Sequence, residues 1–303
     1  MLPMTDSSPF LSTTFSFHIS YILLAMPTPT TKRPEISLTN EQIIERCRDS
    51  PDRKLISNPL CSVKVVQLDG ELAVKCGSYL KHAEAINQAQ AHEMLDSSIV
   101  RVPYVHRFFT DDDGKGYIVM ELISGVESDC MAEHELSIIL GIIKHLATFK
   151  RDIPGPVDCS SPSGLLFESA ADITPAFNSI LELEDWWDLR LCGKSTLSIR
   201  NLPLVFCHLD IAPRNIIWQA NGIPALIDWA SAGYFPHFFE YCLQKVMGGD
   251  QPMFAVRLAE LLAHDYDEET IIKTRQILWA WQAMQRYLRY FLLLDLDMCI
   301  DLL

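Results

Sequence analysis

The stretch from Phe206 to Trp229, FCHLDIAPRNIIWQANGIPALIDW, constrains the fold of this 303-residue chain more than any other. It contains two short apolar runs, NIIW and IPALID, separated by the turn residues Asn221-Gly222. Asn-Gly between two runs of this kind is a strong signal of a β-hairpin. Such a hairpin would bring Asn215, at the start of the first run, close to Asp228, at the end of the second.

The same stretch carries three polar side chains suited to one kind of chemistry. Asp210 lies five residues before Asn215, and Asp228 follows thirteen residues after it. An amide oxygen and a carboxylate can together bind Mg²⁺, a hard ion that prefers oxygen ligands. A separate carboxylate can orient an attacking hydroxyl group and accept its proton. A single Asp in a loop is more often a turn former or a cap, but the three residues together predict metal-assisted transfer of the γ-phosphoryl group of a nucleotide.

The spacing of these residues also resembles that of a known family. The pattern H-x-D-x-x-x-x-N from His208 to Asn215, followed by Asp228-Trp229, is similar to the catalytic and metal-binding loops of the aminoglycoside phosphotransferase and choline kinase family. Members usually carry H-G-D, so Leu209 replaces a glycine. The run WASAGYFPHFFEYC after Asp228 is similar to that of fungal-type members. The resemblance implies an α+β, bilobal protein-kinase-like fold, with a small N-terminal antiparallel-sheet lobe and a larger, mainly helical C-terminal lobe.

Upstream residues match other parts that this resemblance implies. The runs VKVVQL and ELAVKC, joined by Asp69-Gly70, predict a second hairpin with Lys75 in its second strand. In the family, the lysine of a V-x-K strand contacts the α and β phosphates of ATP. The Ala- and Glu-rich segment 81–96 predicts a helix. Its Glu84 and Glu93 lie on opposite sides, at about 100° per residue, so only one can face the lysine. The E-A pattern of the family favours Glu84, with Glu93 as the alternative.

The run YIVMELISG, residues 117–125, resembles the hinge between the two lobes. In that interpretation the backbone of Glu121 and Ile123 meets the edge of the adenine ring. The predicted division of the chain is therefore an N-terminal nucleotide-binding lobe at 37–123 and a C-terminal catalytic and acceptor-binding lobe at 124–303.

Residues 1–36 are rich in Ser, Thr and Pro and are expected to form a disordered leader. Their apolar patch, Phe10–Met26, is too short and too interrupted to span a bilayer. The nine cysteines of the chain are single, with no C-x-x-C pair, which argues against a disulfide framework or a zinc site and favours a reducing, cytoplasmic location.

The net charge is −14, from 25 Lys and Arg against 39 Asp and Glu, and no basic run is segregated from the rest. This balance argues against nucleic acid as a partner, and it would tolerate or attract a cationic small substrate. The sequence makes no prediction of the oligomeric state.

We therefore predict an ATP-dependent phosphotransferase, a kinase that uses Mg²⁺ to move a phosphoryl group to a hydroxyl of a small molecule. The alternative is a catalytically inactive kinase-like domain that binds a nucleotide, a ligand or a protein partner. Leu209 and the lack of any glycine between Pro51 and Asp69, where a loop should cover the phosphates, motivate that alternative. The intact set of Lys75, Asp210 and Asp228 favours the enzyme.

Two residues beyond the hairpin have two interpretations. Glu240 and Tyr241 either neighbour the acceptor or anchor a loop against the C-terminal lobe.

Overall fold

The computed structural model describes residues 36–48, 53–168, 173–247 and 252–300. The leader predicted for residues 1–36 lies outside these ranges, apart from its last residue. The described residues from Leu38 onward belong to one compact unit, and the lobe boundary predicted after residue 123 stays a prediction. Within the described ranges, no helix combines the length and the apolar character needed to cross a membrane.

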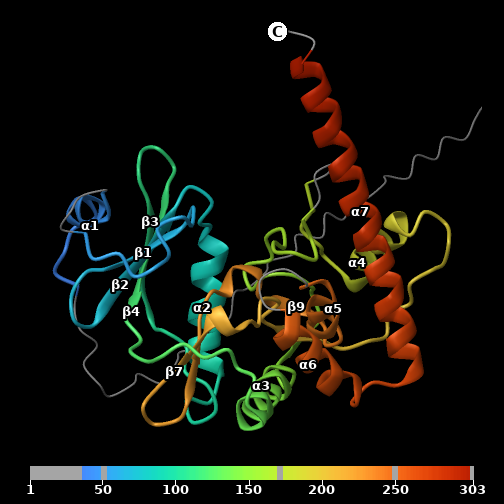
Figure 1. The fold of residues 1–303 in the computed structure, drawn as a ribbon, viewed down its shortest axis with the longest axis horizontal. Helices are drawn as coiled ribbons and strands as arrows, with labels where there is room; N and C mark the ends of the chain where they lie inside the picture. Colours follow the sequence, from blue (N-terminus) through green and yellow to red (C-terminus); the bar gives the residue numbers. More distant parts are fainter. Residues whose placement is uncertain (1–35, 49–52, 169–172, 248–251, 301–303) are drawn as a thin grey trace, which may run out of the picture. The chain divides into compact units, whose positions relative to one another are not determined.

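The N-terminal part is a four-stranded antiparallel sheet with two helices (Figure 1). The strand order is β1-β2-β4-β3, and the register places Lys75 opposite both Val65 and Ile118. The predicted helix at 81–96 is present as α2. The elements are α1 (Asn40–Cys47), β1 (Lys64–Gln67), β2 (Leu72–Gly77), α2 (His82–Met94), β3 (Val105–Thr110) and β4 (Gly116–Glu121).

The C-terminal part is mainly helical and contains two small sheets. Strand β6 lies between β5 and β9 in one sheet, and β7 pairs with β8 in the other. The elements are α3 (Glu133–Leu146), β5 (Lys150–Arg151), α4 (Ile180–Arg190), β6 (Leu204–Cys207), the short 3₁₀ helix η1 (Pro213–Asn215), β7 (Ile216–Trp218), β8 (Pro224–Leu226), η2 (Trp229–Ser231), β9 (Gly233–Pro236), α5 (Phe239–Val246), α6 (Pro252–Ala263) and α7 (Glu268–Ile300). The predicted α+β class is confirmed.

Two apolar clusters hold the C-terminal part together and fix the stretch from 206 to 229. The first joins the buried face of α3 to the hairpin, through side chains that include Ile139, Ile216 and Leu226. The second joins α4, α5 and α7 to the loop before the hairpin, and it includes Trp187 and Leu209. The stretch from 206 to 229 is therefore anchored on both sides by buried apolar surface, the main favourable term in folding.

Gly125, after β4, lies against the hairpin at a distance that leaves no room for a side chain. Val126 and Trp218 exchange two backbone hydrogen bonds of 2.9 Å across this contact. A Cβ atom on Gly125 would lie 2.5 Å from the backbone oxygen of Trp218 and 2.6 Å from Cγ2 of Ile217. A side chain here would force the backbone of the hairpin to move.

We expect Gly125→Ala to destabilise the protein by about 1–3 kcal/mol, the usual cost of overpacking. The matched control is Gly141→Ala, in an exposed position of α3 where a new Cβ meets nothing within 4 Å. That change should stabilise the protein by about 0.5–1 kcal/mol, because Ala favours the helix. Urea unfolding of both variants measures the difference. Effects of the same sign would contradict the close approach at Gly125.

Candidate active site

The predicted hairpin is present, and it fixes the position of two of the three polar residues. Strand β7 pairs with β8 in the register Ile216 opposite Leu226, and the turn between them has Gly222 at φ +80°. One step beyond the paired residues, the backbone N–H of Ile227 donates to the backbone oxygen of Asn215 at 3.0 Å. Asn215 and Asp228 therefore flank the open end of the hairpin.

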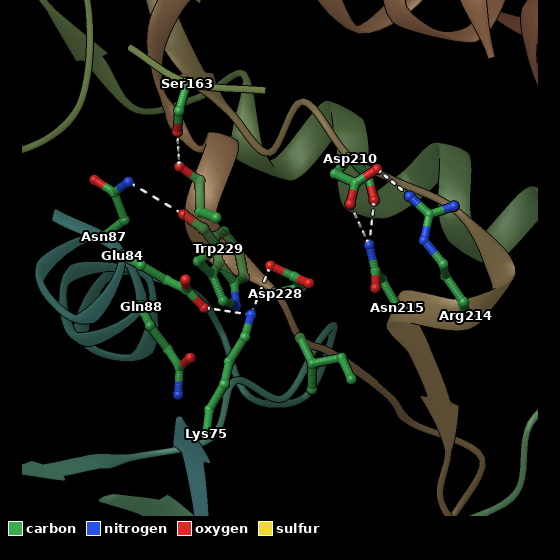
Figure 2. Close-up of polar contacts among 12 residues, drawn as sticks. Lys75, Glu84, Asn87, Gln88, Ser163, Asp210, Arg214, Asn215, Asp228 and Trp229 are labelled. Carbon is green, nitrogen blue, oxygen red and sulfur yellow. Dashed lines mark hydrogen bonds and ion pairs between the residues drawn. The ribbon is translucent and has the colours of Figure 1, made fainter. Parts of the chain in front are cut away.

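Lys75 lies between two carboxylates that come from distant parts of the chain (Figure 2). Its Nζ is 2.6 Å from Oε1 of Glu84, in the first turn of α2, and 2.9 Å from Oδ1 of Asp228. Glu93, the alternative partner, is exposed. The side chain of Asp228 is 37% exposed, against 12% for Lys75 and 5% for Glu84. Asp228 is thus the member of the cluster that a ligand can reach.

Within this cluster, Lys75 and Asp228 hold each other in the ionised form. Burial disfavours the ammonium ion of Lys75, but Glu84 and Asp228 outweigh it and raise its pKa. Burial would also raise the pKa of Asp228, yet the contact with Lys75 lowers it below its ordinary value. For Glu84 burial is the larger effect, so its pKa is raised although Lys75 opposes the change. Asp228 is therefore a stronger acid than Glu84 and keeps its negative charge to lower pH.

A second cluster surrounds Asp210 (Figure 2). Its Oδ1 is 2.5 Å from Nη2 of Arg214, and its Oδ2 accepts a 2.8 Å hydrogen bond from Nδ2 of Asn215. The same Nδ2 donates to the backbone oxygen of Asp210 at 2.8 Å. Burial raises the pKa of Asp210, while Arg214 and Asn215 oppose that shift. Because Asn215 uses its amide nitrogen here, its Oδ1 is the atom suited to a metal ion.

Leu209, which stands where the family usually has glycine, adopts a left-handed backbone. Its φ is +55°, a region that costs an ordinary L-residue about 1–2 kcal/mol. Its side chain is 2% exposed and belongs to the second apolar cluster. Burying a leucine side chain contributes roughly 1.5–3 kcal/mol, enough to offset the strain. The left-handed conformation at this position is therefore stabilised by packing of the Leu209 side chain.

Glu240 holds the backbone of the same loop. Its buried Oε1 accepts the N–H of His208 at 2.5 Å and the N–H of Leu209 at 3.1 Å. Burial raises the pKa of Glu240 to about 7, although these two hydrogen bonds oppose the shift. Its Oε2 is buried without a partner among the described residues. Of the two interpretations given above, these contacts support the loop anchor.

His208 links the loop to the end of the hairpin. Its Nδ1 accepts the N–H of Asp210 at 3.2 Å, so its Nε2 carries the hydrogen and donates to the backbone oxygen of Ile227 at 3.1 Å. Burial lowers the pKa of His208 to about 4. The imidazole is therefore neutral near pH 7 and acts as a structural link between the two clusters.

At the predicted hinge, Glu121 and Ile123 differ in whether their backbone N–H groups are already hydrogen-bonded. The N–H of Glu121 donates to the backbone oxygen of Tyr104 at 2.9 Å, and its side chain forms an ion pair with Arg101. Ile123 follows β4, and among the described residues its N–H forms no hydrogen bond.

A cavity of about 630 Å³ opens beside the lysine cluster. It lies between the start of α2, including Glu84, and the loop that carries Ser163 and Gly164. Ala230 and Ser231, just after Asp228, also line the cavity. The residues of the second cluster do not line it, so the cavity flanks the α2 side of the site.

The buried carboxyl group of Glu240 predicts a pH-dependent stability. Because its pKa is higher in the folded chain than its ordinary value of 4.5, it stabilises the fold at low pH, and this contribution is lost as pH rises through about 7. The stability of the wild type relative to Glu240→Gln should therefore fall between pH 5 and 8, by up to about 3 kcal/mol. Urea unfolding across that range measures it.

Glu184→Gln is the control for this experiment. Glu184 is also buried, but Arg200 and two backbone N–H groups lower its pKa against the effect of burial. Its contribution is present above the ordinary pKa and lost only at lower pH. A wild-type-minus-variant difference for Glu240→Gln that stays flat from pH 5 to 8 would contradict a raised pKa.

Comparison with known proteins supports the family. A model of the phosphotransferase enzyme family (APH) matches residues 63–267. The apo form of a thermostable mutant of aminoglycoside phosphotransferase APH(4)-Ia has a TM-score of 0.51 and 13% identity, covering 82% of this chain and 89% of that one. The GDP and kanamycin complex of APH(2")-IIia has a TM-score of 0.51 and 13% identity, covering 85% and 93%. No curated protein sequence matches the chain.

At these identities the solved structures show the fold alone, which is the one predicted. The match to the family model extends from β1 to the start of α7 and covers more than half of the 303 residues. The chain therefore belongs to the phosphotransferase enzyme family and has the kinase-like α+β fold of the aminoglycoside phosphotransferases.

Proposed function

We propose that this protein moves the γ-phosphoryl group of ATP, with Mg²⁺, to a hydroxyl group of a small molecule. One observation carries the proposal: Lys75 and Asp228, which are 153 residues apart, meet at 2.9 Å. Glu84 lies on the other side of the lysine, and Asp210 and Asn215 stand at the open end of the same hairpin. The phosphate-binding lysine, the metal ligands and the carboxylate base of phosphoryl transfer each have a residue of suitable chemistry at this site.

Nucleotide binding would use the N-terminal part. In this proposal the Lys75 ammonium, oriented by Glu84, contacts the α and β phosphates. The adenine ring lies at the hinge of Glu121 and Ile123, where the N–H of Ile123 is available to donate a hydrogen bond. The similar structure that contains GDP makes GTP the nucleotide to compare with ATP.

The metal ion would be held by Asp228 and Asn215. In the described part of the chain, no three His, Cys, Asp or Glu side chains gather into a group that could hold a metal. Two protein ligands fit a magnesium ion that also takes phosphate oxygens and waters. The partly exposed carboxylate of Asp228 and Oδ1 of Asn215 are hard oxygen donors of the right kind. The ion, when bound, neutralises charge on the phosphates.

Asp210 would orient the acceptor hydroxyl and accept its proton. Its carboxylate is held by Arg214 and Asn215, so its direction is fixed before the acceptor binds. A loose transition state depends mainly on positioning and charge neutralisation. The net charge of −14 favours a cationic acceptor.

An inactive kinase-like domain is the second candidate, and one contact favours it. Oδ1 of Asp210 is already engaged by Arg214, which competes with an acceptor for that oxygen.

Thermal unfolding with ATP and with GTP, each with and without Mg²⁺, tests the proposal. We expect a Mg²⁺-dependent rise in Tm with at least one nucleotide; its absence with both would exclude the enzymatic function. Acceptor-stimulated ADP or GDP release, screened over aminoglycosides, choline, ethanolamine, amino alcohols and sugars, then identifies the acceptor. Nucleotide binding without any stimulated release would favour the inactive domain.

Substitutions of Asp210 and Asp228 should impair different steps. Asp210→Asn should abolish transfer and leave Mg-ATP binding intact, because Asp210 acts on the acceptor. Asp228→Ala should weaken Mg-ATP binding itself, because it removes a metal ligand. Calorimetric titration with and without Mg²⁺, combined with the release assay, separates the two effects. Asp112→Asn, in the exposed turn between β3 and β4, is the matched control and should change neither. The roles are wrong if Asp210→Asn loses nucleotide binding as well.

Arg214 should set the acid limb of the pH profile. Its guanidinium opposes the burial that raises the pKa of Asp210, so Arg214→Met should raise that pKa further. Because Asp210 must be ionised to accept a proton, kcat should begin to fall at a higher pH in the variant than in the wild type. A profile of kcat from pH 5 to 9 measures the shift, with Arg257→Met, in an exposed ion pair with Glu260, as control. Identical acid limbs would show that Asp210 does not limit the rate.

A further inference from the structure

A buried asparagine in α2 joins that helix to the segment after Asp228 and to the loop that contains Val157, and Figure 2 shows its contact with Trp229. Asn87 is 0% exposed and lies three residues after Glu84. Its Nδ2 donates to the backbone oxygens of Trp229, at 3.1 Å, and Ala232, at 2.8 Å. Its Oδ1 accepts the N–H of Val157 at 2.9 Å. The amide thus donates and accepts at once, as no apolar or singly functional side chain can.

Two of these bonds connect α2 to the first residue of η2 and to the residue after it, and the third connects α2 to Val157, in the loop after β5. Trp229 follows Asp228 directly, and Ala232 precedes strand β9. Residues three apart in a helix lie on the same face, so Glu84, which binds Lys75, and Asn87, which binds the C-terminal part, are neighbours on α2. A movement of α2 that separated Glu84 from Lys75 would also break the bonds of Asn87.

We propose that Asn87 is a positioning residue that holds α2 where Glu84 binds Lys75 beside Asp228. The site is then assembled in the isolated chain, without an activating partner or a covalent modification that moves α2. This inference rests on the proposed function for its effect on activity, but the contacts themselves do not depend on it.

The neighbouring residue shows that not every buried amide of α2 does this. Gln88 is 2% exposed, and its Nε2 donates to the backbone oxygen of Pro103 at 2.9 Å and lies 3.6 Å from Sδ of Met120. Both partners belong to the N-terminal part. Gln88 therefore fixes α2 to its own sheet, whereas Asn87 fixes it to the segment that follows Asp228 and to the loop that contains Val157.

Replacing Asn87 should mainly weaken the contact between α2 and the η2 segment. An apolar side chain would leave the buried carbonyl of Ala232 and the N–H of Val157 without these bonds, and buried groups left unpaired are costly. The penalty falls on the state in which α2 lies against η2. Small displacements of groups that position a substrate can reduce catalysis strongly.

The experiment compares Asn87→Leu with Gln88→Leu, the same change in chemistry at adjacent buried positions. Both should lower the urea midpoint. Only Asn87→Leu should reduce kcat/KM for the nucleotide by about tenfold or more, with saturating acceptor. Asn87→Asp is the second variant, because it keeps the acceptor for Val157 and loses the donor for Trp229 and Ala232. Its kcat/KM for the nucleotide should be reduced as in Asn87→Leu.

Amide hydrogen exchange without substrate gives a readout that does not require activity. The N–H of Val157 donates to Asn87, so its protection should drop at least tenfold in Asn87→Leu and persist in Gln88→Leu. Equal losses of activity and of protection in the two variants would show that Asn87 contributes only to packing, as Gln88 does, and would overturn the proposal. If the wild type transfers no phosphate, the proposed function fails, but the exchange of Val157 still decides whether Asn87 holds α2.

Discussion

The arrangement of this protein depends on one buried cation placed between two carboxylates. Lys75 comes from β2, Glu84 from α2 and Asp228 from the end of the hairpin, so one ion-pair cluster fixes three elements relative to one another. Removing Lys75 would leave the buried carboxylate of Glu84 without its cation, which is far more costly than the pair is stabilising. The main effect of the cluster is therefore to fix the relative positions of the three elements, and its contribution to stability is smaller. The polar contacts of Asn87, on the same face of α2 as Glu84, tie that helix to the residue that follows η2 and to Val157.

The loop that carries Asp210 is shaped by its surroundings and not by its own flexibility. Leu209 takes a left-handed conformation that glycine would adopt at little cost, and burial in the second apolar cluster offsets the strain. Glu240 binds two consecutive N–H groups of the loop, and neutral His208 connects it to the end of β8. A departure from the family pattern at one position is thus accommodated by apolar packing and backbone hydrogen bonds, while the chemical groups stay in place.

Sequence reasoning identified the residues with local signals and missed those whose signal is tertiary. The Asn-Gly and Asp-Gly turns between short apolar runs predicted the hairpins, and the Ala- and Glu-rich segment predicted α2. Asn87 was missed because a single Asn in a helix full of Gln and Glu has no distinguishing pattern. Its one available signal was its place on the same helical face as Glu84, three residues away. Glu240 was noticed, but the sequence left its role open between two interpretations.

The sequence by itself determined the chemistry of the site: the types and spacing of Asp210, Asn215 and Asp228, which lie close along the chain and are joined by a tight turn. Only the tertiary structure decided which groups meet across long separations. It paired Lys75 with Glu84 and left Glu93 exposed, and it brought Lys75 to a carboxylate 153 residues away. The physical reason is that turns and helical faces follow from covalent spacing, whereas burial and long-range ion pairs follow from how the whole chain packs.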